Sequence, residues 1–299
     1  MSEGLSLKVD VECAPCLLHR GYREILEATS DNTLQFRAMT ALTRLLDKEF
    51  KSTAVPAYLG TKRDRLVKTI TGNTDPYAKK KWASNQRALE ILPQVKRLVA
   101  QEKSIEDRFR KACLFAIVGN IIEFDIPEHD FNFDDMAKCV SQAQGDLAVD
   151  EIPRILDVAR SAKDILYLTD NAGEIAFDTL LVAQLKKLGA HVVVAVKGKP
   201  IINDATLQDA KAVGMQEIAD DLITNGTDSV GLIMRECTKR FVSLYKSADL
   251  VVAKGVGYAE TLTETKLSTP HALLLRTKCS PVARFFGTVK GKNVAKLIV

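Results

Sequence analysis

The chain has 299 residues, of which 46% are hydrophobic and 27% charged, and its formal net charge at pH 7 is +4. This composition is ordinary for a globular protein of one large domain or two smaller ones, and the balanced charge argues against a nucleic-acid partner. No apolar run is long enough to span a bilayer, and residues 1–11 lack the apolar core of a signal peptide. We therefore expect a cytoplasmic protein with no membrane partner.

The first half of the chain has the periodicity of helices. Apolar residues recur every three or four positions there, and Pro93 interrupts one such run. The predicted helices cover residues 15–28, 33–50, 59–71, 78–99, 104–122, 136–149 and 152–161. This pattern predicts an all-helical unit over residues 1–155.

The second half alternates short β-branched runs with helical stretches. The predicted strands are 165–169, 191–196, 250–253 and 272–276, with a further short strand at 293–299. The predicted helices between them are 175–188, 204–213, 231–246 and 260–264. Strands separated by helices indicate a parallel sheet covered on both faces, so residues 156–299 are expected to form an α/β domain.

Six cysteines without a secretion signal indicate free thiols rather than a disulfide framework. Cys13 and Cys16 form a CxxC motif, with His19 one helical turn further on. A structural zinc site needs four ligands, and no second CxxC is present. A metal or redox role and ordinary helix packing both remain open for this pair.

The strand predicted at 165–169 ends in an unusual group of residues. Asp170 and Asn171 follow it directly, and Ala172, Gly173 and Glu174 lead into the next helix. Carboxylate and amide oxygens suit Mg²⁺ or Mn²⁺ better than zinc, and helix N-termini favour phosphate. Ligands of open α/β sheets bind beyond the carboxyl ends of strands. We therefore predict a divalent metal ion beside a phosphate at this strand end.

Further candidates follow the next strands. Asp204 comes after the second strand, where it is either a helix N-cap or a third metal ligand beside Asp170 and Asn171. Asp228 lies in a polar loop, as a ligand, an acid–base group or a turn residue. Lys278, after the strand at 272–276, is either a phosphate clamp or a solvated charge.

The loop after the strand at 250–253 contains Lys254, Gly255 and Tyr258, and small residues there would let backbone amides approach a ligand. No dinucleotide-binding glycine motif, P-loop or serine nucleophile elbow is present. These absences argue against hydride transfer, nucleoside triphosphate hydrolysis and acyl transfer.

Taken in order, these motifs resemble those of the metal-dependent damage-control phosphatases, a family first known as the domain of unknown function number eighty-nine. The resemblance rests in the α/β half on Asp170-Asn171-Ala172-Gly173-Glu174, Pro200-Ile201-Ile202-Asn203-Asp204-Ala205-Thr206, Ala253-Lys254-Gly255 and Lys278-Cys279-Ser280-Pro281-Val282-Ala283. In the helical half it rests on Cys13-x-x-Cys16, Asp75-Pro76-Tyr77, Asn85 and Gly119-Asn120, which look like the archaeal and bacterial branch.

The resemblance implies an N-terminal helical bundle packed on a Rossmann-like α/β domain. It also implies hydrolysis of phosphate monoesters of small phosphorylated metabolites, such as sugar phosphates or damaged metabolites, with Mn²⁺, Co²⁺, Ni²⁺ or Mg²⁺. Carried over by position, Asp170, Asn171 and Asp204 would bind the metal and Lys278 the transferred phosphoryl group. Backbone amides around residues 172–174 would assist. Tyr258 departs from the asparagine that family members often carry, which leaves the substrate preference open.

The helical unit is expected to form a lid or wall that selects the leaving group. Its candidates are Asp75, Asn85 and Asn120, each of which fits equally well as a cap or an interhelical hydrogen bond. The nucleophile would be a metal-activated water or a carboxylate such as Asp170. The alternative function is a non-catalytic binder of a phosphorylated metabolite or nucleotide in the same crevice.

Overall fold

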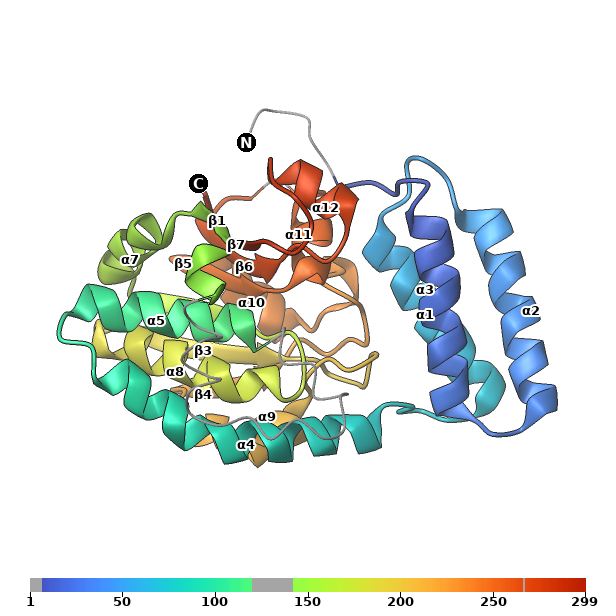
Figure 1. Ribbon diagram of the computed structural model, residues 1–299, viewed down its shortest axis with the longest axis horizontal. Coiled ribbons are helices and arrows are strands. Elements are labelled where there is room, and N and C mark those ends of the chain that lie inside the picture. Colours follow the sequence, from blue (N-terminus) through green and yellow to red (C-terminus); the bar gives the residue numbers. More distant parts are fainter. Residues whose placement is uncertain (1–6, 120–141, 266) are drawn as a thin grey trace.

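The structure is a computed structural model that describes residues 7–119, 142–265 and 267–299 (Figure 1). Seven strands in this part of the chain form one sheet in the order β1-β7-β6-β5-β2-β3-β4. The strands are β1 (Leu147–Asp150), β2 (Asp164–Leu168), β3 (His191–Val196), β4 (Asp221–Thr224), β5 (Leu250–Lys254), β6 (His271–Arg276) and β7 (Asn293–Ile298). Strands β2 to β6 are parallel, whereas β7 is antiparallel to β6 and carries β1 at the edge.

The described helices fall into three groups. Helices α1 (Cys13–Ala28), α2 (Asn32–Glu49) and α3 (Pro56–Thr71) form a bundle beside the sheet. One face of the sheet is covered by α4 (Ala78–Ala100), α5 (Ile105–Val118), α7 (Ile152–Ser161), α8 (Glu174–Lys187) and α9 (Leu207–Ala212). The other face is covered by α10 (Lys239–Ser247), α11 (Val256–Leu262) and α12 (Ser280–Phe285).

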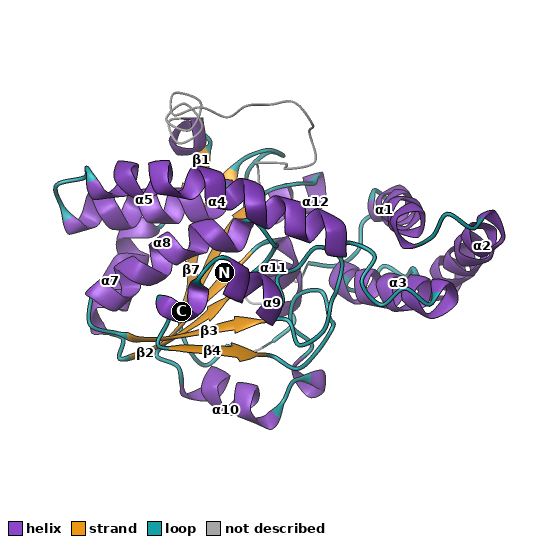
Figure 2. Cartoon of the chain, turned by 90° about the horizontal axis from the view of Figure 1, so that it is seen from below, coloured by secondary structure: helices purple, strands orange, loops and turns teal. Residues whose placement is uncertain are grey.

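Both faces of the sheet are covered by helices because successive side chains of a strand point to opposite faces, so each strand contributes apolar residues to two cores. In β2, Ile165 and Tyr167 join the core under α5 and α8, whereas Leu166 and Leu168 join the core under α10. Figure 2 shows α4, α5 and α8 on one side of the strands, α10 on the other, and the α1–α3 bundle to one side. The predicted combination of a helical bundle and a Rossmann-like sheet is confirmed.

The bundle has small cores of its own, built around Leu17, Leu42 and Leu46 and around Ile25 and Val67. Helices α4 and α5 instead share the large core of the sheet layer, although both precede residue 155. Strand β1 also precedes that residue. The sheet layer therefore begins earlier in the chain than the division into 1–155 and 156–299 places it.

Several predicted elements differ from the observed ones. Residues 147–150 form β1 rather than the end of a helix, because Asn293 to Ala295 of β7 offer them a partner strand. The part of that predicted helix from 136 to 141 lies outside the described residues. Helix α10 begins only at Lys239, where the Thr238 side chain caps it, instead of at residue 231. Strand β4 was not predicted, since its four residues carry little pattern.

Candidate active site at the carboxyl ends of the parallel strands

The candidate site lies at the point where the strand order reverses. Strand β2 has β3 on one side and β5 on the other, and the chain leaves β2 toward β3 but reaches β5 only after β4. Such a switch point opens a crevice beyond the strand ends. The loops after β2, β3 and β5 meet at this point, since Ala205 bonds to Asp170 and Gly255 packs against it.

Backbone hydrogen bonds join the loops after β2 and β3. The Ala205 N–H donates to the Asp170 carbonyl at 2.7 Å, and the Ala172 N–H donates to the Asn203 carbonyl at 2.9 Å. Asn171 and Asp204 therefore pair as an isolated antiparallel bridge. The structure brings Asp170, Asn171 and Asp204 together, although a helix and a strand separate the first two from the third along the chain.

Asp204 is not the N-cap of the following helix. Helix α9 begins at Leu207, and Thr206 caps it in a capping box with Asp209. The N-cap interpretation of Asp204 is therefore wrong. Its buried carboxylate instead lies 3.4 Å from the Lys197 ammonium.

The carboxylates at this rim repel one another. Burial, and then the charges of Glu174 and Asp204, raise the pKa of Asp170 well above its usual value. Burial likewise raises the pKa of Asp204 to about 6, although Lys197 acts in the opposite direction. A cation placed between these groups would relieve the repulsion. Two carboxylates and one amide oxygen make a donor set that suits a hard divalent ion.

Hydrogen bonds fix the Asn171 side chain. Its Nδ2 donates to Asp170 Oδ2 at 3.0 Å and to Glu174 Oε2 at 2.9 Å. The only atom of the amide able to ligate a metal is Oδ1, and these two bonds set the direction in which it points. The Glu174 side chain thus orients a candidate ligand.

Lys254, expected to bind substrate, lies in the interior. Its ammonium donates to Glu174 Oε1 at 2.6 Å and to Asp178 Oδ1 at 2.8 Å, and its exposed fraction is 0%. Tyr167 also donates to Asp178 Oδ1 at 2.7 Å. Lys254 therefore holds Glu174 in place, and two of the three N–H groups of its ammonium are already bonded to carboxylates.

Two of the backbone amides expected to assist a phosphate already have partners. The Ala172 N–H is bound by Asn203, and the Gly173 N–H donates to Asn85 Oδ1 at 2.7 Å. Asn85 in turn donates to Asp209 of α9 at 2.9 Å, so it ties α4 both to α9 and to the loop after β2. The hydrogen-bonding interpretation of Asn85 matches this arrangement better than substrate contact.

Three further candidates are Asp75, Asn120 and Asp228. Asp75 pairs with Lys81 at 2.7 Å. Asn120 lies outside the described residues. Asp228, from the loop after β4, accepts a hydrogen bond from Arg65 of α3 at 2.6 Å. Burial raises the pKa of Asp228, but the bond to Arg65 outweighs it, and the net pKa lies below the usual value.

Lys278 extends from the loop after β6. It is exposed, and its positive charge lowers the pKa of Asp170. In being open to solvent, Lys278 differs from Lys197 and Lys254, which are buried at the ends of β3 and β5. This exposure fits a cation that meets a phosphorylated ligand.

Sequence reasoning missed Lys197 and its contact with Tyr258. The Lys197 ammonium donates to the carbonyls of Ser229 at 2.9 Å and Gly231 at 2.7 Å, and lies 4.7 Å from the centre of the Tyr258 ring. Burial raises the pKa of Tyr258 to about 12. Tyr258 is therefore a buried partner of Lys197, and Lys197 in turn forms an ion pair with Asp204. A charged residue directly after the apolar run 192–196 was the available signal.

Helix α3 connects the bundle to the site. Asp64 accepts a hydrogen bond from the Ile202 N–H at 3.0 Å, and Lys68 donates to the Pro200 carbonyl. Ile202 has φ of +46°, a conformation that is costly for a β-branched residue. These contacts hold the loop that presents Asp204, so helix α3 supports that loop.

Gly255 lies directly behind Asp170. A Cβ at this position would stand 2.0 Å from Asp170 Oδ2, and the residue has φ of +86°. Any larger residue would thus have to displace the carboxylate. The close approach of the loop after β5 requires glycine here.

We expect Gly255→Ala to reduce metal-dependent phosphatase activity at least about tenfold, because the new methyl group displaces the Asp170 carboxylate from its position. Gly189→Ala is the matched control. Gly189 has φ of +99° and no atom within 4 Å of a Cβ, so it carries the same kind of backbone strain without a clash. Steady-state kinetics and thermal unfolding of both variants check this, and equal activity of the two would contradict it.

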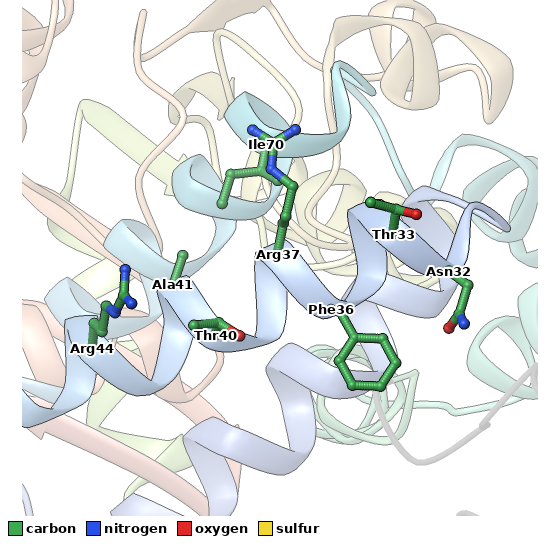
Figure 3. A pocket seen from close by; sticks show the side chains of 8 residues that line it. All are labelled: Asn32, Thr33, Phe36, Arg37, Thr40, Ala41, Arg44 and Ile70. Atoms are coloured by element: carbon green, nitrogen blue, oxygen red, sulfur yellow. The ribbon is translucent and has the colours of Figure 1, made fainter.

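A separate pocket of about 630 Å³ lies on the helical bundle, away from this rim (Figure 3). Its lining comes from one side of α2, including Phe36, Arg37 and Arg44, and from Ile70 of α3. None of its lining residues follows a strand of the sheet. The pocket is therefore not part of the candidate active site.

In the described ranges, no group of three or more histidine, cysteine, aspartate or glutamate side chains is arranged to hold a metal ion. The set at the rim differs in kind, since one of its three members is the amide of Asn171. No helix in the described ranges combines the length and apolarity required to cross a membrane.

Comparison with known proteins identifies the family. The model of the damage-control phosphatase ARMT1-like domain matches residues 9–294. The chain belongs to this family. It is 37% identical to a damage-control phosphatase of Archaeoglobus fulgidus over 98% of this chain and 100% of that protein. It is 33% identical to a damage-control phosphatase of Pyrococcus horikoshii over 96% and 97% of the two chains.

An uncharacterized protein of Methanocaldococcus jannaschii is 38% identical over 97% of this chain and 96% of its own length. The crystal structure of the Pyrococcus horikoshii family member superposes with a TM-score of 0.86, covering 96% of this chain and 98% of that one. The predicted family membership is therefore confirmed. The assignment to a branch marked by Cys13 and Cys16 remains a prediction.

Proposed function

We propose that this family member is a phosphatase that hydrolyses phosphate monoesters of small metabolites, damaged metabolites among them, with a divalent metal ion. The observation that carries the proposal is the bridge between Asn171 and Asp204, which gathers three oxygen-bearing side chains at one rim. The positive charge of Lys278 acts on Asp170 of this set. The names of the Archaeoglobus and Pyrococcus relatives support the same activity.

Asp170, Asn171 and Asp204 would hold the metal, with Mn²⁺, Co²⁺, Ni²⁺ and Mg²⁺ as candidates. Bound there, the ion would neutralise charge on the phosphoryl oxygens. Lys254 acts through Glu174 to orient Asn171, and Lys197 holds Asp204. Lys278 would meet the phosphoryl group from the side of the β6 loop, adding a positive charge where negative charge is spread over the equatorial oxygens.

The deciding experiment measures hydrolysis of p-nitrophenyl phosphate, and then of a panel of phosphorylated metabolites, by chelator-treated protein with each metal added back. We expect turnover only with metal, together with an increase in melting temperature when metal is added. Metal-induced stabilisation without turnover of any ester would favour the non-catalytic binder. If metal caused neither stabilisation nor turnover, the metal site would be refuted.

We expect Lys278→Ala to lower kcat for p-nitrophenyl phosphate by roughly 100-fold. The substitution removes a positive charge that would stabilise the negative charge developing on the phosphoryl oxygens. Lys290→Ala, which removes another exposed lysine from the same end of the chain, should leave the rate unchanged. Metal-induced stabilisation should survive in both variants, since neither lysine is a ligand. Wild-type kinetics in Lys278→Ala would exclude it as the phosphate clamp.

A further inference from the structure

We propose that Cys13 and Cys16 are a redox-active dithiol that exchanges with low-molecular-weight disulfides to form an intramolecular disulfide. The proposed phosphatase activity does not use these residues. Both cysteines are free thiols, and they lie in the first turn of α1, where Cys13 is the first residue. Residues three apart in a helix are neighbours, which is the spacing that CxxC pairs at helix N-termini exploit.

The segment before α1 fixes this dithiol against the rest of the protein. The Val9 N–H donates to the Ala54 carbonyl at 2.9 Å, and Arg284 of α12 pairs with Asp10 at 2.7 Å. The Asp10 N–H in turn contacts the Cys13 sulfur at 3.4 Å. Figure 1 shows the segment that leads into α1 running beside α12. The Cys13 sulfur is thus held in place and the turn is pre-organised.

The two thiols differ in access. Cys16 is exposed, whereas Cys13 is half-buried. Burial, and then the charges of Glu260, Cys279 and Cys16, raise the pKa of Cys13 despite the bond from Asp10. Cys16 is therefore the thiol that a soluble disulfide meets first, and Cys13 is placed to resolve the product.

The exchange balances in two steps. The Cys16 thiolate attacks one sulfur of a small disulfide RSSR, forms a mixed disulfide and releases RS⁻, which takes up the proton that Cys16 lost. Cys13 then loses its proton and attacks the Cys16 sulfur, so the second RS⁻ leaves and takes up that proton. In sum, two cysteine thiols are oxidised by two electrons and RSSR is reduced to two RSH.

A thiolate metal site is the competing use of these cysteines. Cys279, the residue before α12, lies close enough to influence the pKa of Cys13. Within the described part of the chain, however, three such side chains are nowhere arranged to hold a metal. A structural zinc site needs four ligands, so the CxxC pair by itself suits exchange better than metal binding.

The test equilibrates the full-length protein in buffers of reduced and oxidised glutathione, alkylates the remaining thiols under denaturing conditions and maps peptides by mass spectrometry. We expect a Cys13–Cys16 disulfide whose fraction rises with the oxidised share of the buffer. Cys16→Ser should abolish it, whereas Cys113→Ser, which removes a buried thiol of α5, should leave it unchanged.

Alkylation of both cysteines at every buffer ratio would overturn the proposal. So would a disulfide that joins Cys16 to Cys279, or a Cys16–glutathione adduct that Cys13 never resolves. Circular dichroism of Cys16→Ser serves as the folding control, and a retained fold is expected because Cys16 is exposed. The readout does not involve phosphatase activity, so it stands or falls separately from the proposed function.

Discussion

Asp204→Asn should reduce metal-dependent phosphate ester hydrolysis by about a thousandfold or more, and Asp170→Asn should do the same. The reason is the loss of one of only two carboxylates that would hold the metal. A bound metal contributes several kcal/mol to transition-state stabilisation, and about 4 kcal/mol corresponds to a thousandfold. Steady-state kinetics with saturating Mn²⁺, together with the metal-induced shift in melting temperature, measure both effects.

The matched control is Asp164→Asn. Asp164 begins the same strand, β2, that Asp170 follows, so it lies at the opposite end of the sheet and is exposed. Activity and metal-induced stabilisation should both survive there. If Asp204→Asn retained full activity, the assignment of the metal to this rim would be wrong, whatever the behaviour of Asp170→Asn.

Lys254→Met should destabilise the protein by about 3–5 kcal/mol, because it leaves Glu174 and Asp178 as unpaired carboxylates in the interior. In a chain of this length, that corresponds to a fall in melting temperature on the order of 10 °C. Thermal or urea unfolding of the metal-free protein measures the loss. Since Glu174 also orients Asn171, metal-induced stabilisation should weaken in the same variant.

Two further variants isolate the cause. Lys246→Met removes an exposed lysine of α10 and should change the free energy of unfolding by no more than about 0.5 kcal/mol. Adding Glu174→Gln and Asp178→Asn to Lys254→Met removes the stranded charges and should recover part of the loss. An unchanged melting temperature in Lys254→Met would show that the buried triad contributes nothing to stability.

The candidate ligands illustrate what a sequence pattern can predict. Asp170 and Asn171 follow an apolar strand and precede a helix, so their place at a strand end depends only on neighbouring residues. Asp204 was less certain, because its surroundings also fit an N-cap. Only the hydrogen bonds between the two loops, such as that from Ala205 to Asp170, decide that it faces Asp170.

The lysines illustrate the opposite case. In the sequence, Lys254 and Lys278 each follow a strand and each fit a phosphate-binding role. The structure separates them, since Lys254 is fully buried between two carboxylates and Lys278 is exposed. Lys197 is buried as well, against Asp204 and Tyr258. No local pattern distinguishes a lysine that will be paired in the interior from one that will face a ligand.

Local sequence was enough to predict the family, the order of most strands and helices and the oxygen-bearing residues at the ends of β2 and β3, because periodicity and strand-end chemistry depend on residues a few positions apart. Only the tertiary structure decided that β1 joins the sheet and that α3 packs against the loop of Asp204. It also decided that Lys254 forms buried ion pairs. Its partners Glu174 and Asp178 lie 80 and 76 positions away in the chain. A buried charge must be neutralised by whichever groups the fold brings near, and those groups are distant in sequence.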